Sequence, residues 1–129
     1  MTVIPIESEL YPGYYEIPGY ADYVINKEGN VKVSISHRYR PSGMDIAIIN
    51  DGIDMPRRIY IWPRKKENVW RNNKQAVLIA KLLLLTFIGP KKLNYYRPCY
   101  RDFNSLNLSI DNLYWDSSKA YIDKQSIIC

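Results

Sequence analysis

The segment from Tyr96 to Asp116 gathers side chains that can do chemistry within a short span of chain. It reads YRPCYRDFNSLNLSIDNLYWD and holds three aspartates and three asparagines. Oxygen ligands of this kind suit Mg²⁺, so Asp102, Asp111 and Asp116 are candidates for gathering a metal ion in a new geometry. Asn and Asp side chains also bond to backbone groups of turns, and the segment has no helical periodicity, which favours a loop or tight hairpin.

The chain offers few partners for catalysis. Its one histidine is His37, and its two cysteines are Cys99 and Cys129, a set that cannot build a structural zinc site. Tyr100 is a poor general base near neutral pH, because the pKa of a phenol is about 10. We therefore expect no catalytic residue, no metal ligand and no cofactor. The N-terminus lacks the basic start and apolar core of a signal peptide, which predicts free thiols in a cytoplasm.

The net charge of +5 permits binding to a polyanion without demanding it. The basic residues cluster, and clustering alone fits a solvated loop as well as a phosphate-binding patch. The candidates for phosphate contacts are Lys32, Arg57, Arg58, Arg64, Lys65, Lys66 and Arg71. Twelve tyrosines are also present, and the candidates for packing on sugars or bases are Tyr14, Tyr15, Tyr20, Tyr23 and Trp62, with core packing as the alternative.

Turn signals and apolar runs predict the elements that must position these residues. A first hairpin spans residues 23–33 around Gly29, and a second spans 42–61 around Asn50-Asp51-Gly52. A helix is expected from Lys74 to Phe87, capped by Asn72 or Asn73 and ended by Gly89-Pro90. Its apolar run of thirteen residues is shorter than the roughly 20 that span a bilayer, so we expect no membrane contact. A last short helix is expected after a cap at Asp116 or Ser117.

The stretch Ile17–Ser34 resembles the NUMOD4 motif of phage homing endonucleases. That motif has the form I-P-G-Y, two residues, Y-x-I-S, two residues, and G-R-V-K-S. The residues in register are Gly19, Tyr20, Tyr23, Ile25, Gly29, Val31 and Lys32, while the usual arginine is replaced by Asn30. In the resembled enzymes this region is associated with DNA binding, so the resemblance makes DNA the candidate partner.

A second stretch resembles the HNH nuclease module of the same enzymes, in which a helix precedes a polar hairpin. Lys81, Leu82, Phe87 and Ile88 match the helix. Asp102, Asn104, Leu106, Asn107, Asn112, Leu113 and Trp115 match the hairpin without a gap. For these seven we expect structural roles: the polar ones hold turns, and Leu106, Leu113 and Trp115 are buried against the helix. The basic segment 62–75 looks inserted.

The catalytic positions of the resembled module are not kept. The position of the general base is Tyr100, and the positions of the metal ligands are Cys99 and Tyr121. The helix position that is usually histidine is Ala80. Without the base and the hard ligands, the resemblance implies fold and ancestry rather than nuclease activity.

These patterns predict an α+β fold in which small β-hairpins precede a helix and a degenerate ββα-metal hairpin. We expect one compact unit made of a NUMOD4-like β module (1–40), a β-hairpin with a basic loop (41–75) and a degenerate HNH-like module (76–129). The expected function is nucleic-acid binding by an inactive, phage-encoded protein in the host cytoplasm or on the virion. The alternatives are an interaction protein that binds a virion or host component such as RNA polymerase, and a nuclease with a rebuilt metal site.

Overall fold

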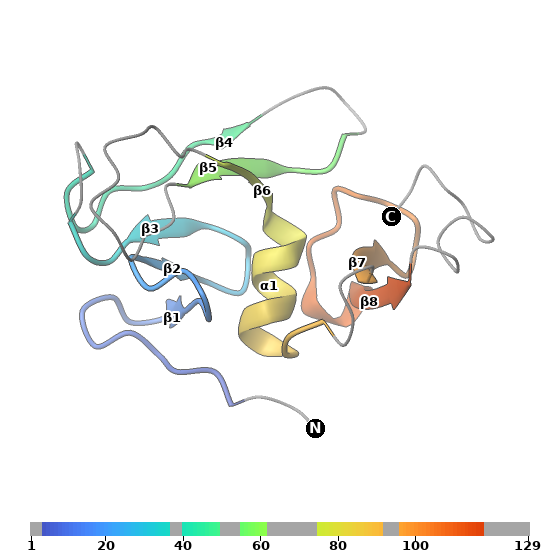
Figure 1. Cartoon of the computed structure of the whole chain (residues 1–129), viewed down its shortest axis with the longest axis horizontal. Coiled ribbons are helices and arrows are strands. Elements are labelled where there is room, and N and C mark those ends of the chain that lie inside the picture. Colours follow the sequence, from blue (N-terminus) through green and yellow to red (C-terminus); the bar gives the residue numbers. More distant parts are fainter. Residues whose placement is uncertain (1–3, 37–39, 50–54, 62–74, 92–95, 118–129) are drawn as a thin grey trace.

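Figure 1 shows a computed structural model, which describes residues 4–36, 40–49, 55–61, 75–91 and 96–117. The α+β class is confirmed: three small antiparallel sheets surround one α-helix, with α1 between the first two sheets and the β7–β8 hairpin. The elements are β1 (Tyr15–Glu16), β2 (Tyr23–Ile25), β3 (Val31–Val33), β4 (Ile48–Ile49), β5 (Arg58–Ile61), β6 (Gln75–Leu78), α1 (Ile79–Phe87), β7 (Tyr96–Tyr100), the 3-10 turn η1 (Ile110–Asn112) and β8 (Leu113–Ser117).

The first sheet has the order β1-β2-β3 and contains the predicted hairpin. Tyr23 lies opposite Val33 in the β2–β3 pair, and Gly29 in the connecting turn has a φ of +90°. A side chain at Gly29 would also collide with Ile79, whose Cγ2 lies 2.9 Å from the place of a Cβ. Backbone hydrogen bonds extend both edges of the sheet, through the N-terminal arm 6–8 beside β1 and through residues 43–46 beside β3. The arm is held there by an isolated bridge between Glu7 and Tyr15.

The second sheet has the order β4-β5-β6. The hairpin predicted over 42–61 is confirmed in part, because Ile48–Ile49 pair with β5 whereas residues 43–46 bond to β3 of the first sheet. The predicted start of the helix is wrong. Residues Gln75–Leu78 form strand β6 along β5, with Val77 opposite Ile59, and the helix cap is Leu78. An apolar run reads alike as a buried strand or a buried helix, and pairing with β5 decides between them. Asn72 and Asn73 lie outside the described residues.

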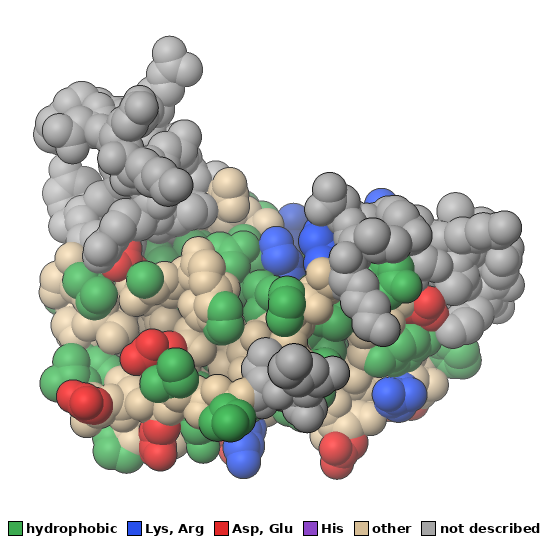
Figure 2. Space-filling view, turned by 60° about the horizontal axis from the view of Figure 1, so that its bottom comes forward, with side chains coloured by type: hydrophobic (Ala, Val, Ile, Leu, Met, Phe, Trp, Pro, Cys, Tyr) green, Lys and Arg blue, Asp and Glu red, His purple; other side chains and the backbone are tan. Residues whose placement is uncertain are grey.

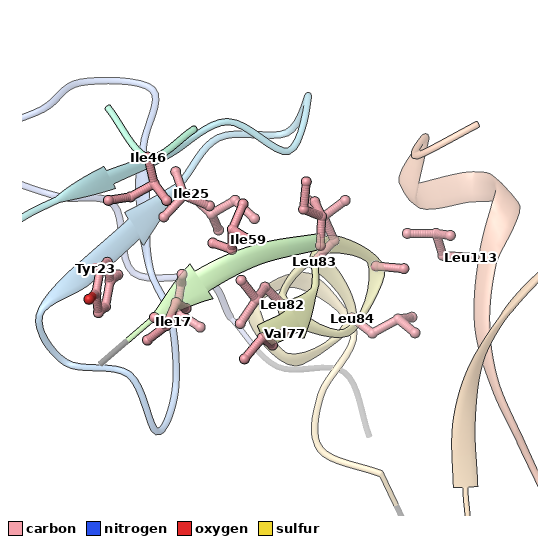
Figure 3. Packing of buried hydrophobic residues seen from close by; sticks show 14 of the residues in the cluster. Ile17, Tyr23, Ile25, Ile46, Ile59, Val77, Leu82, Leu83, Leu84 and Leu113 are labelled. Carbon is pink, nitrogen blue, oxygen red and sulfur yellow. The ribbon is translucent and has the colours of Figure 1, made fainter. Parts of the chain in front are cut away.

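Helix α1 is buried on most of its surface because sheet and hairpin residues pack around it (Figure 3). Its first backbone N–H, from Ile79, donates to the Arg57 carbonyl over 3.1 Å, and its end is closed by Gly89, whose N–H donates to the Leu84 carbonyl over 2.8 Å. The buried Thr86 hydroxyl donates to the Leu82 carbonyl over 2.7 Å. Among the described residues, no helix has the length and apolar content needed to cross a bilayer.

One cluster of buried side chains joins all three sheets to α1. It contains Ile17, Tyr23, Ile25, Val31, Val33, Ile46, Ile59, Ile61, Val77, Ile79, Ala80, Leu82, Leu83, Leu84, Tyr100 and Leu113. Each large apolar side chain that is fully buried contributes about 1.5–3 kcal/mol. Strand β6 crosses the expected boundary between residues 75 and 76, so the second and third expected modules share a sheet.

The third sheet is the β7–β8 hairpin, in which Tyr100 lies opposite Leu113. Residues 96–100 are the first arm of this hairpin, so the interpretation of the segment as a tight hairpin is confirmed. Asp116 and Ser117 belong to β8, and the final helix predicted after them falls on residues that the structure does not describe. Residues 118–129 lie outside the described part of the chain. The hairpin is tied to the end of α1 by Trp115, whose Nε1–H donates to the Gly89 carbonyl over 2.9 Å.

Candidate functional site

The polar residues of the β7–β8 loop bond to the loop itself. The Asp102 N–H donates to Asn112 Oδ1 over 3.0 Å, and Asn112 Nδ2 donates to the Asn107 carbonyl over 2.9 Å. The carboxylate of Asp102 accepts from the Asn104 N–H on one oxygen and from Asn107 Nδ2 on the other. Asn104 Oδ1 accepts from the Leu106 N–H. The predicted turn-holding role of these four residues is confirmed.

The network favours the ionised form of Asp102. The Asn107 amide, followed by the Asn104 N–H, lowers the pKa of this carboxyl below its ordinary value of 3.8. Both carboxylate oxygens already have donors, which argues against Asp102 as the centre of a rebuilt metal site. Leu113 is buried and Trp115 packs against the core as predicted, but Leu106 is 38% exposed, so the prediction of its burial is wrong. A tight polar loop lifts Leu106 away from α1.

The positions where the resembled nucleases carry out chemistry lie inside the protein. Tyr100, Cys99 and Ala80 are at most 1% exposed. The Cys99 thiol donates to the Arg97 carbonyl over 3.6 Å, and a buried thiol next to a phenol that packs in the core does not fit Mg²⁺. No group of three or more His, Cys, Asp or Glu residues is placed to hold a metal within the described segments. His37 and Tyr121 lie outside them.

Lys32 is the candidate phosphate contact of the first sheet, and it already has an anionic partner. Its Nζ lies 2.8 Å from Asp45 Oδ1, and the side chain is 23% exposed. The hydrogen bond from Lys32 to Asp45 raises the pKa of the lysine. The ammonium also lies over the Tyr14 ring, 5.4 Å from its centroid. Lys32 is thus neutralised locally, so it is a weak candidate for phosphate binding.

Most of the candidate aromatic residues pack within the protein. Tyr23 is 1% exposed, and Tyr15 contacts the Phe87 ring edge to face at 5.1 Å. Tyr20 packs against the core and lies under the Lys81 ammonium. The alternative of core or hairpin packing is therefore favoured for these tyrosines. Trp62 lies outside the described residues.

The second sheet turns an arginine and a tyrosine outward. In the central strand β5, Ile59 and Ile61 are buried, so Arg58 and Tyr60 point to the opposite face. Arg57 precedes the strand and is half-buried. Arg40 lies at the same strand, where its Nη1 donates to the Tyr60 carbonyl over 2.9 Å and to the Tyr23 hydroxyl over 3.2 Å. The alternation of residues in RIYI could have predicted that Tyr60 lies on the outer face of the strand. No feature of the neighbouring sequence predicted the role of Arg40.

The chain between β5 and β6 carries the remaining candidates. Arg64, Lys65, Lys66 and Arg71 lie in it and outside the described residues. Residues 57–74 hold seven Lys or Arg against one Glu, a net charge of +6, whereas all other residues hold eleven cations against twelve carboxylates, a net of −1. On the face shown in Figure 2, basic and acidic side chains are interspersed. The segment that carries the excess positive charge of the protein therefore connects two strands of the second sheet.

Comparisons of the chain with family models, curated proteins and solved structures return no match. The resemblance to the NUMOD4 and HNH modules of phage homing endonucleases therefore rests on the quoted sequence motifs alone.

Proposed function

We propose that the chain is a nucleic-acid-binding protein that keeps an HNH-like arrangement of helix and hairpin without the nuclease chemistry. Its binding surface is the β4–β5–β6 sheet with the basic segment 57–74. The observation that carries this proposal is the charge distribution, because a net charge of +6 over eighteen residues attracts phosphates while the remainder of the chain is close to neutral. The resemblance to phage enzymes is the ground for proposing a phage origin and action in the host cytoplasm.

The loss of nuclease chemistry has separate support. A general base must reach water beside a scissile phosphate, and Tyr100 at that position is packed against the core with Leu113 opposite. A metal there would need hard oxygen ligands, for which a buried Cys99 is a poor substitute. Asp102, Asn104, Asn107 and Asn112, which match the hairpin of the resembled module, bond to the loop backbone and to one another.

The test is a binding titration with three charges removed. We expect R64Q/K65Q/K66Q to weaken binding to fluorescein-labelled DNA by roughly tenfold or more at low salt, since each lost phosphate contact removes an ion-release contribution. The slope of log affinity against log salt concentration should become shallower by about 2, because each lost phosphate contact contributes 0.7–0.9 to it. Fluorescence anisotropy between 25 and roughly 200 mM salt measures both quantities.

A matched control removes the same number of charges elsewhere. Lys27, Lys91 and Arg97 are exposed and belong to other parts of the surface, so K27Q/K91Q/R97Q should change affinity by less than about threefold. Equal effects of the two triple variants would mean that net charge, and not the basic segment, governs binding. Wild-type protein that binds no DNA or RNA at low salt would overturn the proposal.

Protein interaction is a second candidate function, favoured by large apolar side chains on the surface. Ile4, Ile6 and Leu10 on the N-terminal arm are 60–89% exposed, and Phe103 on the hairpin loop is 46% exposed. Such side chains mark interaction sites when they gather on one surface. A pull-down of tagged protein with and without nuclease treatment separates the candidates, because a nuclease-resistant, stoichiometric partner supports this function over nucleic-acid binding.

A further inference from the structure

We infer that the outward face of the β4–β5–β6 sheet binds single-stranded nucleic acid, with Tyr60 stacked on a base and Arg58 contacting an adjacent phosphate. The inference rests on the proposed function and names its ligand and contact residues. Neither residue type alone would be informative. The informative feature is their placement, two residues apart on one face of a central strand.

The geometry of β5 sets both side chains outward. Residues two apart on a strand project from the same face at a spacing of about 6.7 Å, which places the Arg58 guanidinium beside a nucleotide stacked on Tyr60. Tyr60 is 39% exposed although it sits in the middle strand of the sheet. The residue directly opposite it on β6 is Ala76, which is small.

The outward face around Arg58 and Tyr60 is partly apolar. Ile49 on β4 and Leu78 on β6 lie on either side of Arg58 in the sheet register, and Ala76 on β6 lies opposite Tyr60. Beneath the sheet, Ile59 and Ile61 pack into the core and fix the strand. Arg40 binds the Tyr60 carbonyl and the buried Tyr23 hydroxyl, so it joins the first sheet to the second and acts as a positioning residue. A rigid ring loses little entropy when a base stacks on it.

A single strand fits this face better than a duplex. The faces of bases in a duplex are already stacked on one another, whereas a single strand can splay a base onto an aromatic side chain. Apolar neighbours such as Ile49 and Leu78 suit a base and have no use beside a duplex backbone. The charge is complementary as well, because the +6 segment continues from one strand of this sheet to the next.

The experiment compares Tyr60→Leu with Tyr60→Phe. The probes are a labelled DNA 20-mer of mixed sequence, the RNA of the same sequence, and the DNA annealed to its complement. Tyr60→Leu should weaken binding to the single strands by roughly 5- to 100-fold, the loss expected for one base–aromatic stack, and duplex binding by less than about twofold. Tyr60→Phe keeps the aromatic face and should restore single-strand affinity. The DNA and RNA arms show which sugar is preferred.

Phe103→Leu is the matched control, because it removes an exposed aromatic ring from the hairpin loop and should leave every affinity unchanged. Thermal melts of each variant show that the fold is retained. Single-strand affinity that persists in Tyr60→Leu but falls in R64Q/K65Q/K66Q overturns this inference and leaves the proposed function standing. Equal losses for single strand and duplex also overturn it. Absence of any nucleic-acid binding by the wild type overturns both.

Discussion

The β7–β8 hairpin and the β4–β5–β6 sheet use polar residues in opposite ways. The hairpin is rich in Asp and Asn, and its Asp102, Asn107 and Asn112 bond to one another and to the loop backbone. The sheet looks unremarkable in sequence, yet its central strand places the exposed Tyr60 and the half-buried Arg58 on its outward face. The direction of a side chain therefore says more about function than its type does.

The same contrast holds for the residues that resemble catalytic ones. Tyr100 and Cys99 replace a base and a ligand, and both belong to the interior of the hairpin. Once such positions face the core, apolar packing selects the residue that fills them. We therefore expect hairpin variants to change stability and sheet variants to change binding.

The largest expected effect comes from Tyr100→His, which restores the residue type of the resembled nucleases. It should lower the free energy of unfolding by about 2–4 kcal/mol, since a smaller ring leaves a cavity and two ring nitrogens replace one buried hydroxyl. No DNA cleavage should appear with Mg²⁺ or Mn²⁺. Urea denaturation and a plasmid-nicking assay measure the two outcomes.

The control for this variant is Tyr114→His, the same exchange at a half-buried position of the adjoining strand. It should cost less, because solvent reaches that side chain and the main loss is the contact between Arg101 and the Tyr114 ring. Metal-dependent nicking by Tyr100→His would remove the distinction between the two regions, since the hairpin would then hold a latent active site.

Local turn chemistry made the first hairpin predictable. Gly29 at positive φ specifies its reversal from a few neighbouring residues, whereas Asn50, Asp51 and Gly52 lie outside the described residues. The start of α1 was not predictable in this way, because Ala76–Leu78 are as apolar as the helix and become a strand only by pairing with β5. Leu106 was misjudged because a match of residue type does not show the path of the loop, in which the Leu106 N–H is bonded to Asn104 and the side chain is 38% exposed.

The candidate site was predictable only in part. Arg57 and Arg58 could be chosen as candidate phosphate contacts because charge is visible in the sequence. The same list of candidates also included Lys32. Its partner Asp45 is thirteen residues away, and the backbone pairing that joins them does not appear as a sequence pattern. Arg40 was missed because its two hydrogen bonds reach residues seventeen and twenty positions away.

An intermediate effect is expected from Asp102→Asn, which tests whether the hairpin network stabilises the fold. The pKa of Asp102 is lowered in the folded chain, so its ionised form stabilises the fold above the ordinary value of 3.8, and this stabilisation is lost as pH falls through the folded pKa. The variant should be less stable than wild type at pH 7, with the gap closing toward pH 3. Denaturation at a series of pH values measures the gap.

Asn107→Ala is the companion to that test, because it removes the largest cause of the lowered pKa. An NMR titration should show the pKa of Asp102 moving back toward its ordinary value in this variant. A difference in stability between wild type and Asp102→Asn that is constant from pH 7 to pH 3 would show that the carboxylate does not hold the loop. A purely structural role of the hairpin network would then be contradicted.

The smallest expected effect concerns Phe103, whose φ of +59° is uncommon for a residue with a side chain. The loop network holds this backbone, and a left-handed conformation costs about 1–2 kcal/mol outside glycine. Phe103→Gly should therefore be more stable than Phe103→Ala by about 1 kcal/mol, while both bind nucleic acid as the wild type does. Chemical denaturation and anisotropy of the two variants measure this. An alanine variant as stable as the glycine variant would mean that the loop relaxes, so that the hairpin is less rigid than its hydrogen bonds imply.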